Sequence, residues 1–286
     1  MIRRPVSARL AAATALFAAS CASAPRETEG DTVRAAASAS APVVDGVADD
    51  AAWSGATWLR TTLTGPDGTH DARVAAVVSG GRVFLAVRWT DATEDRVHKA
   101  WKPGESKWVS GPEREDVLAV GFPISGEFTG DMTSPLDCVW DVWHWKAART
   151  DGAGFAMDKR HVNTMTDPGG RRHVEKLSDG RSLYITRPED AGRSATRSIP
   201  APSPAAAITT APQFEAQEPD GSAADVRARG AWKDGWWTVE FSRALDTGHA
   251  DDAPFTGDAI AFALAVLDHA EDEAHAVSPR LTLALR

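Results

Sequence analysis

Short apolar runs recur along the chain and are separated by turn residues. Val-rich runs cover Arg73–Val78 and Val83–Trp89, and Ser79-Gly80-Gly81-Arg82 lies between them. Two such runs around a Gly-rich turn are typical of a β-hairpin. Five similar runs follow: Asp116–Phe122, Val139–Ala147, Trp236–Ser242, Ile260–Asp268 and Leu281–Leu285. No stretch has the period of a long amphipathic helix. The pattern predicts an all-β fold, an immunoglobulin-like or jelly-roll-like β-sandwich.

Two segments interrupt this pattern. Residues 22–41 are rich in Ala, Ser and charged residues without periodicity, so we expect a flexible tether there and a folded domain over residues 42–286. Arg187–Ala224 contains six of the chain's 17 prolines. Because proline removes a backbone donor, this segment is expected to lack regular strands and to form a long Pro-rich surface excursion.

The N-terminus has the order of a secretory signal. Arg3 and Arg4 precede the apolar run Leu10–Ala19, which is too short to cross a bilayer. Ala18-Ala19-Ser20-Cys21 resembles the lipobox of bacterial lipoproteins, although Leu is usual where Ala18 stands. We therefore predict a lipoprotein-type signal peptide over residues 1–21, lipidation at Cys21, and an exported protein that is periplasmic or anchored at the outer membrane. The alternative is cleavage after Ala22-Ser23-Ala24, which would release a soluble protein.

The amino-acid composition limits the kinds of partner that we expect the protein to bind. The chain of 286 residues is 43% hydrophobic, which supports one large core, and its only cysteines are Cys21 and Cys138. A lipidated Cys21 leaves no internal disulfide, so stability must come from the core. The net charge of -9 argues against nucleic acid as a partner and against binding to an anionic membrane surface, because both favour a basic face. Contact with a membrane is expected only through the lipid anchor.

The segment Val139–Arg149 holds three of the 11 tryptophans and offers the clearest candidate chemistry. With a strand period of two, one face carries Trp140, Val142, His144 and Lys146. The opposite face carries Asp141, Trp143, Trp145 and Ala147. An imidazole and a cation beside an apolar surface suit a flat anionic cofactor such as haem. The alternative is a Trp-rich strand in an ordinary β-core.

Several motifs in a fixed order add a family resemblance. Val44-Asp45-Gly46, Asp49-Asp50 and Trp53 resemble the opening of family-nine carbohydrate-binding modules and of their haem-binding relatives. Four later motifs separate the two groups: Val87-Arg88-Trp89, the block Asp141–Arg149, Leu245-Asp246-Thr247-Gly248 with Asp251-Asp252, and Val277-Ser278-Pro279. In this order they resemble the ethylbenzene dehydrogenase-related haem-binding domain, also described as the cytochrome c-552 and dimethylsulfoxide-reductase-like haem-binding domain. The resemblance spans residues 43–286.

The resemblance implies a β-sandwich that holds one haem for electron transfer, like the small haem subunit of periplasmic molybdenum oxidoreductases, with an oxidoreductase or a cytochrome as redox partner. In that family a methionine and a lysine hold the iron. Met132 stands at the position of the methionine, whereas His275 lies where the lysine is expected. Histidine is itself a competent haem ligand, and His144 is the reserve. Lys146 and Arg149 would neutralise the propionates.

The motifs that are missing limit the chemistry further. No Cys-x-x-Cys-His occurs, so any haem must be a non-covalent haem b. Gly-x-Ser-x-Gly, His-Glu-x-x-His and phosphate-binding glycine loops are absent too, which favours an electron carrier or accessory subunit over an enzyme. The alternative function is a haem-free carbohydrate- or ligand-binding surface module whose tryptophans stack on sugars.

Each proposed site residue also has a simpler interpretation. Met132 would then only pack on the end of the sandwich, and His275 would belong to a solvated acidic loop with Glu271, Asp272 and Glu273. Lys146 and Arg149 would pair with nearby aspartates at the surface.

Overall fold

The chain folds almost entirely into β-strands. The computed structural model describes residues 26–66, 68–203, 207–270 and 274–286. Within these ranges three short 3-10 helices occur, η1 (Ala51–Gly55), η2 (Asp151–Ala153) and η3 (Gly221–Ala224). None of the described helices is long and apolar enough to span a bilayer. The strands are β1 (Arg26–Thr28), β2 (Thr32–Arg34), β3 (Ala36–Ala37), β4 (Thr57–Gly65), β5 (Gly68–Ser79), β6 (Arg82–Thr90), β7 (Trp101–Pro103), β8 (Trp108–Ser110), β9 (Val117–Gly126), β10 (Cys138–Lys146), β11 (Met157–Thr164), β12 (His173–Lys176), β13 (Ser182–Thr186), β14 (Thr196–Ser198), β15 (Phe214–Ala216), β16 (Arg227–Lys233), β17 (Trp236–Ala244), β18 (Ala259–Leu267), β19 (Ala276–Val277) and β20 (Leu281–Ala284). The predicted all-β class is confirmed.

The predicted hairpin joins β5 and β6. Ser79 pairs with Arg82, so only Gly80 and Gly81 form the loop. Their φ angles are +56° and +76°. Two consecutive positive φ angles define a turn whose twist matches that of the flanking strands, and glycine adopts them without a steric penalty. The Gly-Gly pair therefore sets the register of this hairpin.

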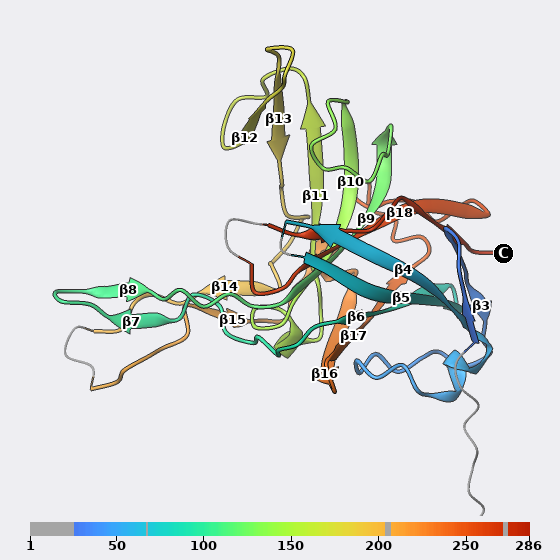
Figure 1. The fold of residues 1–286 in the computed structure, drawn as a ribbon, viewed down its shortest axis with the longest axis horizontal. Coiled ribbons are helices and arrows are strands. Elements are labelled where there is room, and N and C mark those ends of the chain that lie inside the picture. Colours follow the sequence, from blue (N-terminus) through green and yellow to red (C-terminus); the bar gives the residue numbers. More distant parts are fainter. Residues whose placement is uncertain (1–25, 67, 204–206, 271–273) are drawn as a thin grey trace, which may run out of the picture.

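The main sheet folds over itself into two layers. One layer has the order β12-β13-β11-β10-β9-β18, and the other has the order β4-β5-β6-β17-β16; β19 pairs with both β18 and β4 and so connects them (Figure 1). Side chains from the two layers meet in the core. The indole rings of Trp145 on β10 and Trp237 on β17 lie 5.0 Å apart, and Trp89 on β6 contacts both. The fold is thus the predicted β-sandwich.

The aromatic core needs a glycine on β16, because the backbone of that strand lies close to the Trp145 ring. A Cβ at Gly230 on β16 would lie 2.3 Å from Cζ2 of Trp145, so only glycine fits at that position. Trp145 and Trp143 are fully buried. Replacing a buried tryptophan by alanine typically costs about 3–5 kcal/mol. The tryptophans of β10 on this face are therefore core residues first.

The segment before the main domain is ordered, in contrast to the predicted tether over residues 22–41. From Arg26 onward it forms β1, β2 and β3, which pair with β4, β20 and β5. The side chain of Val33 is only 1% exposed. Its strands are too short to show a period, which is why the sequence pattern missed them. The predicted signal peptide over residues 1–21 and Cys21 lie outside the described residues.

The Pro-rich excursion follows the surface, but it is not free of strands. β14 and β15 form a small antiparallel pair within it. It also packs on the hairpin of β7 and β8, because Trp101 Nε1 donates to Ile199 O at 2.9 Å and Trp108 Nε1 donates to Ser203 O at 3.2 Å. Together these segments extend from the sandwich as one arm (Figure 1).

Candidate functional site

β10 separates two different environments. Trp143, Trp145 and Ala147 belong to the main core, whereas Val142 and Trp140 belong to a separate apolar cluster on the opposite face. This is the alternation that the sequence predicted. The neighbouring strand β11 follows the same pattern, because Lys159 lies opposite Val142 and His161 lies opposite Trp140. Every second residue of β10 and β11 therefore points away from the core.

A cavity of about 400 Å³ lies on this outer face. Strands β9, β10, β11 and β18 form its floor, and the loops around them form its rim. The lining residues are His98, Lys99, Arg114, Glu115, Val117, Ala119, Met132, Val142, His144, Lys146, Arg149, Lys159, His161, Arg187, Ala265, Leu267, Ala270 and His275. Its volume is within the range of small-molecule and cofactor sites.

Small side chains leave space above the floor. Ala119 on β9 pairs directly with Ala265 on β18, and Gly121 pairs with Ala263. The apolar cluster of Phe128, Cys138, Trp140, Val142 and Ala263 continues this floor, with Met132 packed against it. Cys138 is thus a buried packing residue. The floor offers an apolar surface without bulky side chains at its centre.

Positive charge dominates the rim. Six Lys and Arg side chains line the cavity, against the single carboxylate of Glu115. Glu115 is already paired, because it accepts hydrogen bonds from the Arg149 guanidinium and from the backbone N–H of Ala148. No other Asp or Glu is among the lining residues. An excess of positive charge in the lining of a cavity favours an anionic ligand.

Lys146 illustrates this imbalance. Its side chain is buried, and its Nζ donates to the thioether sulfur of Met157 at 3.1 Å. A thioether is only a weak acceptor and carries no charge. Burial, reinforced by Arg149 and Lys159, moves the pKa of Lys146 well below its usual value. A carboxylate entering the cavity would stabilise this ammonium group.

The cavity also holds neutral histidines. Both ring nitrogens of His144 are buried, and neither has a hydrogen-bond partner. Burial lowers the pKa of His144 well below its usual value. It also lowers the pKa of His98 to about 3 and that of His161 to about 4. An uncharged imidazole has a lone pair for a metal, so His144 presents an unused donor to the cavity.

Met132 and His275 reach the cavity from opposite ends of the floor. Met132 lies in the loop that follows the last residue of β9, Gly126. His275 follows the end of β18, where Leu267 pairs with Val117 at the start of β9. Two side chains that enter from opposite ends can bind the two sides of one metal.

Five of the six predicted cofactor-binding residues therefore share one cavity. Met132, His144, Lys146, Arg149 and His275 all line it. Trp140 lies beneath them on the same face, where its ring packs 5.2 Å from that of His161. The simpler interpretation of Lys146 and Arg149 is wrong, since neither pairs with Asp141 or Asp151 at the surface; their partners are Met157 and Glu115.

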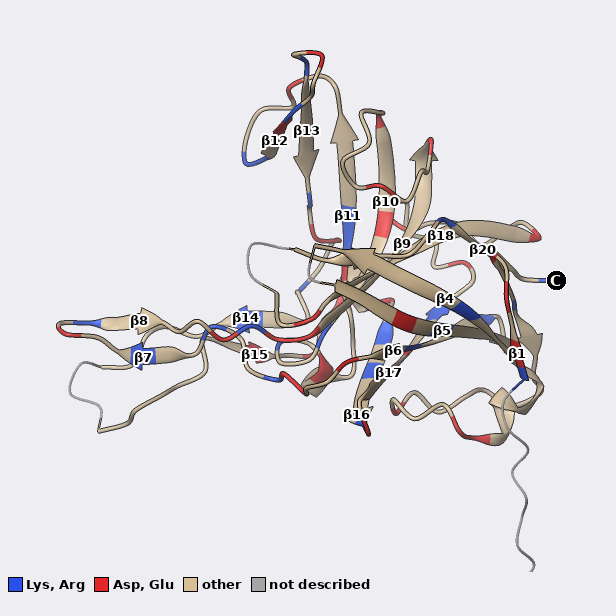
Figure 2. Cartoon of the chain, viewed as in Figure 1, with Lys and Arg blue, Asp and Glu red and all other residues tan. Residues whose placement is uncertain are grey.

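Sequence reasoning missed several lining residues. His98, Lys99, Arg114 and Arg187 come from loops, which have no period to read. Lys159 and His161 come from β11, a strand that the apolar pattern did not indicate. The alternation of Met157, Lys159 and His161 was the available signal, because it matches His144, Val142 and Trp140 across the strand pair. The charged positions on β10 and β11 are visible in Figure 2.

Comparison with known proteins was made at three levels. The ethylbenzene dehydrogenase family profile matches residues 49–277. A curated relative, chlorate reductase subunit gamma from Ideonella dechloratans, is 27% identical over 135 residues, which cover 44% of this chain and 49% of the relative. The chain thus spans about half the length of the curated relative that it matches.

The solved structures give only a distant likeness. A protein from Bacteroides uniformis described as carbohydrate-binding has a TM-score of 0.47 and 10% identity, over 90% of this chain and 100% of that chain. A family-nine carbohydrate-binding module from Caldicellulosiruptor kristjanssonii, in complex with glucose, has a TM-score of 0.40 and 10% identity, over 89% of this chain and 95% of that chain.

Proposed function

Because this chain belongs to the ethylbenzene dehydrogenase family, the haem-binding domain family that its motifs resemble, we propose that its outer cavity binds one non-covalent haem b for electron transfer. The observation that carries the proposal is the combination in one cavity of an apolar floor, excess positive charge and metal-ligand side chains. Haem is flat, largely apolar and carries two propionates, so it matches all three features.

We propose that Met132 and His275 would hold the haem iron, with His144 as the reserve ligand. Support comes from their shared cavity and from the opposite ends at which Met132 and His275 enter it. When bound between such ligands, haem iron supplies reversible one-electron exchange. A thioether ligand raises the reduction potential, as in cytochromes with Met and His ligands. The missing lysine of the family pattern is then replaced by His275.

The basic residues bind and orient the cofactor's carboxylates. Lys146 on β10 and Arg149 in the turn after β10 would donate to the propionates, and Glu115 holds the guanidinium group of Arg149. Charge-assisted hydrogen bonds of this kind are about twice as strong as neutral ones. The apolar floor excludes water from the ring, and burial keeps His144 neutral so that it can act as a metal ligand.

The tryptophans argue against the alternative, a sugar-binding module. Such a module needs indole rings on its surface to stack on sugars. The described residues include all 11 tryptophans, and none of them is among the exposed large hydrophobic side chains. Eight are buried in the two layers and their neighbouring clusters. They serve packing, so haem binding is the function we put forward.

The partner and location are part of the same proposal. The curated relative is named as a subunit of a chlorate reductase. We propose that this chain is an accessory electron-transfer subunit for an oxidoreductase or a cytochrome and is not itself a catalyst. The signal-type N-terminus favours export to the periplasm, and acylation of Cys21 would hold the protein at a membrane surface.

Absorption spectroscopy tests the assignment. We expect the purified chain, reconstituted anaerobically with haem, to give a low-spin spectrum with one haem per chain. Met132→Ala should change the spectrum to high-spin and lower the reduction potential, because the thioether ligand is lost. His275→Ala should also remove the low-spin spectrum.

The matched control is His173→Ala, which removes an exposed histidine from β12 and should leave the spectrum unchanged. If the wild-type chain binds no haem, the proposed function is wrong. If it binds haem and neither Met132→Ala nor His275→Ala alters the spectrum, the function stands and the ligand assignment fails.

A further inference from the structure

A second group of buried charges lies on the core face of β10. Asp141 on β10, Asp158 on β11 and Asp252 in the loop after β17 each place one carboxylate oxygen within 4.8 Å of the others. All three side chains are buried, and Asp158 is only 1% exposed. Three carboxylates this close repel one another strongly unless a cation or protons intervene.

One arginine pairs with this group. The guanidinium of Arg243 on β17 donates to Asp141 Oδ2 and lies 3.4 Å from Asp252 Oδ1. Asp141 Oδ2 also accepts the backbone N–H of Ala253 at 2.9 Å. Three carboxylates and one guanidinium leave two net negative charges. A divalent cation would therefore make the group neutral.

The oxygens that face away from Arg243 have no partner. Asp141 Oδ1, Asp252 Oδ2 and both oxygens of Asp158 are buried without a hydrogen bond. Buried polar atoms are nearly always satisfied, and an ionised carboxylate left alone costs several kcal/mol. Each of the three residues thus keeps at least one unused oxygen, and all of Asp158's acceptors are unused.

We propose that Asp141, Asp158 and Asp252 form a calcium site that joins the two layers of the sandwich. Only oxygen donors are present, which favours Ca²⁺ or Mg²⁺ over zinc. Mg²⁺ needs nearly octahedral geometry and keeps several waters, whereas Ca²⁺ accepts irregular sets of carboxylates. A buried group set by two strands and a loop therefore suits Ca²⁺.

Two neighbouring features fit this site. Asp190 is also buried and lies 3.5 Å from Arg160 Nε, so this pair adds no net charge. Asp252 belongs to a second group with Asp225 and His249, which are partly exposed and pair at 2.6 Å. Asp252 thus lies between the buried aspartates and the partly exposed pair of Asp225 and His249.

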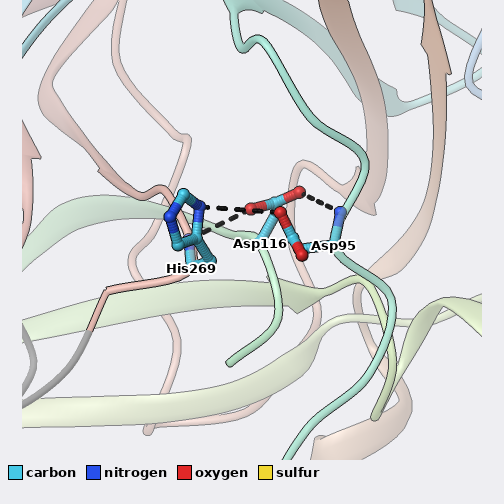
Figure 3. A group of neighbouring side chains, drawn as sticks. All are labelled: Asp95, Asp116 and His269. Carbon is cyan, nitrogen blue, oxygen red and sulfur yellow. Dashed lines mark hydrogen bonds and ion pairs between the residues drawn. The ribbon is translucent and has the colours of Figure 1, made fainter. Parts of the chain in front are cut away.

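Another acidic group differs from the proposed calcium site, because hydrogen-bond donors satisfy its central carboxylate. Asp95, Asp116 and His269 also lie close together (Figure 3). Here Asp116 Oδ1 accepts the backbone N–H of His269, and Asp116 Oδ2 accepts the N–H groups of Asp95 and the Trp237 indole. The carboxylate at its centre has a donor on each oxygen, so this group links loops without a metal. It provides the control for the calcium site.

Thermal unfolding of the full chain tests the proposal. The protein is stripped with EDTA, returned to metal-free buffer and titrated with Ca²⁺ up to about 10 mM, since exported modules bind Ca²⁺ with dissociation constants of about 10⁻⁴–10⁻³ M. We expect the melting temperature to rise by roughly 5–10 °C when Ca²⁺ is about a hundred times its dissociation constant. Asp158→Asn should lose this rise, whereas Asp95→Asn should keep it.

A direct probe of binding is Tb³⁺, which replaces Ca²⁺ and emits when a nearby indole is excited. The Trp143 ring lies 5.1 Å from the Arg243 guanidinium, next to the site. We expect emission that Ca²⁺ displaces in the wild type and in Asp95→Asn, and no such emission in Asp158→Asn. Asp252→Asn serves as the second site variant should Asp158→Asn fail to fold.

Two results would overturn the proposal. One is a wild-type melting temperature that Ca²⁺ does not change, together with no Tb³⁺ signal. The other is an Asp158→Asn or Asp252→Asn protein that is stabilised with or without Ca²⁺, which would show that shared protons neutralise the carboxylates. Neither result depends on haem, so this test and the spectroscopic test of the proposed function can fail separately.

Discussion

The two faces of β10 differ in the sign of the charge that gathers beside them. On the outer face, six Lys and Arg side chains surround one carboxylate in a cavity with an apolar floor. On the inner face, the three aspartates of the proposed calcium site surround one arginine. Successive residues of a strand point to opposite faces, so Asp141 and Val142 belong to different environments although they are adjacent.

The two faces differ in which parts of the fold surround their charged groups. The inner group is held mainly by strands β10, β11 and β17, which carry Asp141, Asp158 and Arg243, and by the loop that carries Asp252. The outer cavity is bordered by the loops that carry His98, Met132, Arg187 and His275. A group fixed by strands suits a permanent structural ion, whereas loops can admit a cofactor or a redox partner.

The same physical rule applies to both faces. Unbalanced charge that is removed from water must be neutralised by protons, by a shifted pKa or by an added ion. On the outer face burial lowers the pKa of Lys146 and that of His144. On the inner face it raises the pKa of Asp158 well above its usual value. Both proposals follow from this rule, because an anionic cofactor would neutralise the outer face and a cation would neutralise the inner one.

Removing the Arg243 guanidinium should cause the largest loss of folding stability. Arg243→Met leaves the aspartates without their only guanidinium, and breaking a buried ion pair from one side costs about 3–5 kcal/mol. Denaturant unfolding would measure this loss. Arg181→Met is the control, because Arg181 pairs with Asp179 at the surface and should change stability by less than about 1 kcal/mol. A loss as small as the control's would mean that Arg243 is not needed to hold the aspartates.

The sequence predicted the outer face better than the inner one. The period of two in β10 divides apolar and polar positions correctly, and the Gly-Gly turn gives the β5–β6 hairpin. Strand β11 was missed because Asp158, Lys159 and Arg160 are consecutive and charged, a pattern typical of exposed segments. Of these three residues only Asp158 is buried, and its neighbours Asp141 and Asp252 belong to segments that meet it only in the folded sandwich.

A second misleading pattern in the sequence involves two adjacent aspartates. Adjacent aspartates such as Asp251 and Asp252 are typical of a turn, because aspartate favours turns. Asp251 does accept from the Ser222 hydroxyl, but Asp252 is buried beside Arg243. No local pattern distinguishes two adjacent aspartates of which one faces the core. The positions of Met132 and His275 came from resemblance, and the cavity that they share could be seen only in three dimensions.

The pH dependence of folding stability should report on the outer face through His98. Burial, with Arg149, Lys99, Lys146 and Arg114 nearby, lowers the pKa of His98 to about 3. Its ordinary value in the unfolded chain is near 6.5, so between about pH 6.5 and pH 3 the unfolded state binds the extra proton. The folded state therefore loses stability as the pH falls through this window, by up to about 1.4 kcal/mol per pH unit.

His98→Asn removes this contribution. Relative to the variant, the wild type should lose about 2 kcal/mol between pH 6.5 and pH 4, as measured by denaturant unfolding at several pH values. His173→Asn, at the surface, should run parallel to the wild type. If the stability curves of wild type and His98→Asn are also parallel, His98 is protonated in the folded state and the outer face is not closed to protons.

The smallest expected effect on stability comes from the outer cation, and its sign gives the sharpest contrast with Arg243. Lys146→Met keeps the length of the side chain but removes an ammonium group that has only the Met157 thioether as acceptor and that Arg149 and Lys159 repel. We expect unfolding free energy to stay the same or to rise by up to about 1 kcal/mol, while haem affinity falls because a partner of the propionates is lost. Lys176→Met, an exposed change on β12, should alter neither quantity. A destabilisation by Lys146→Met as large as that by Arg243→Met would mean that the chain itself already neutralises Lys146, and the outer face would then need no anionic ligand.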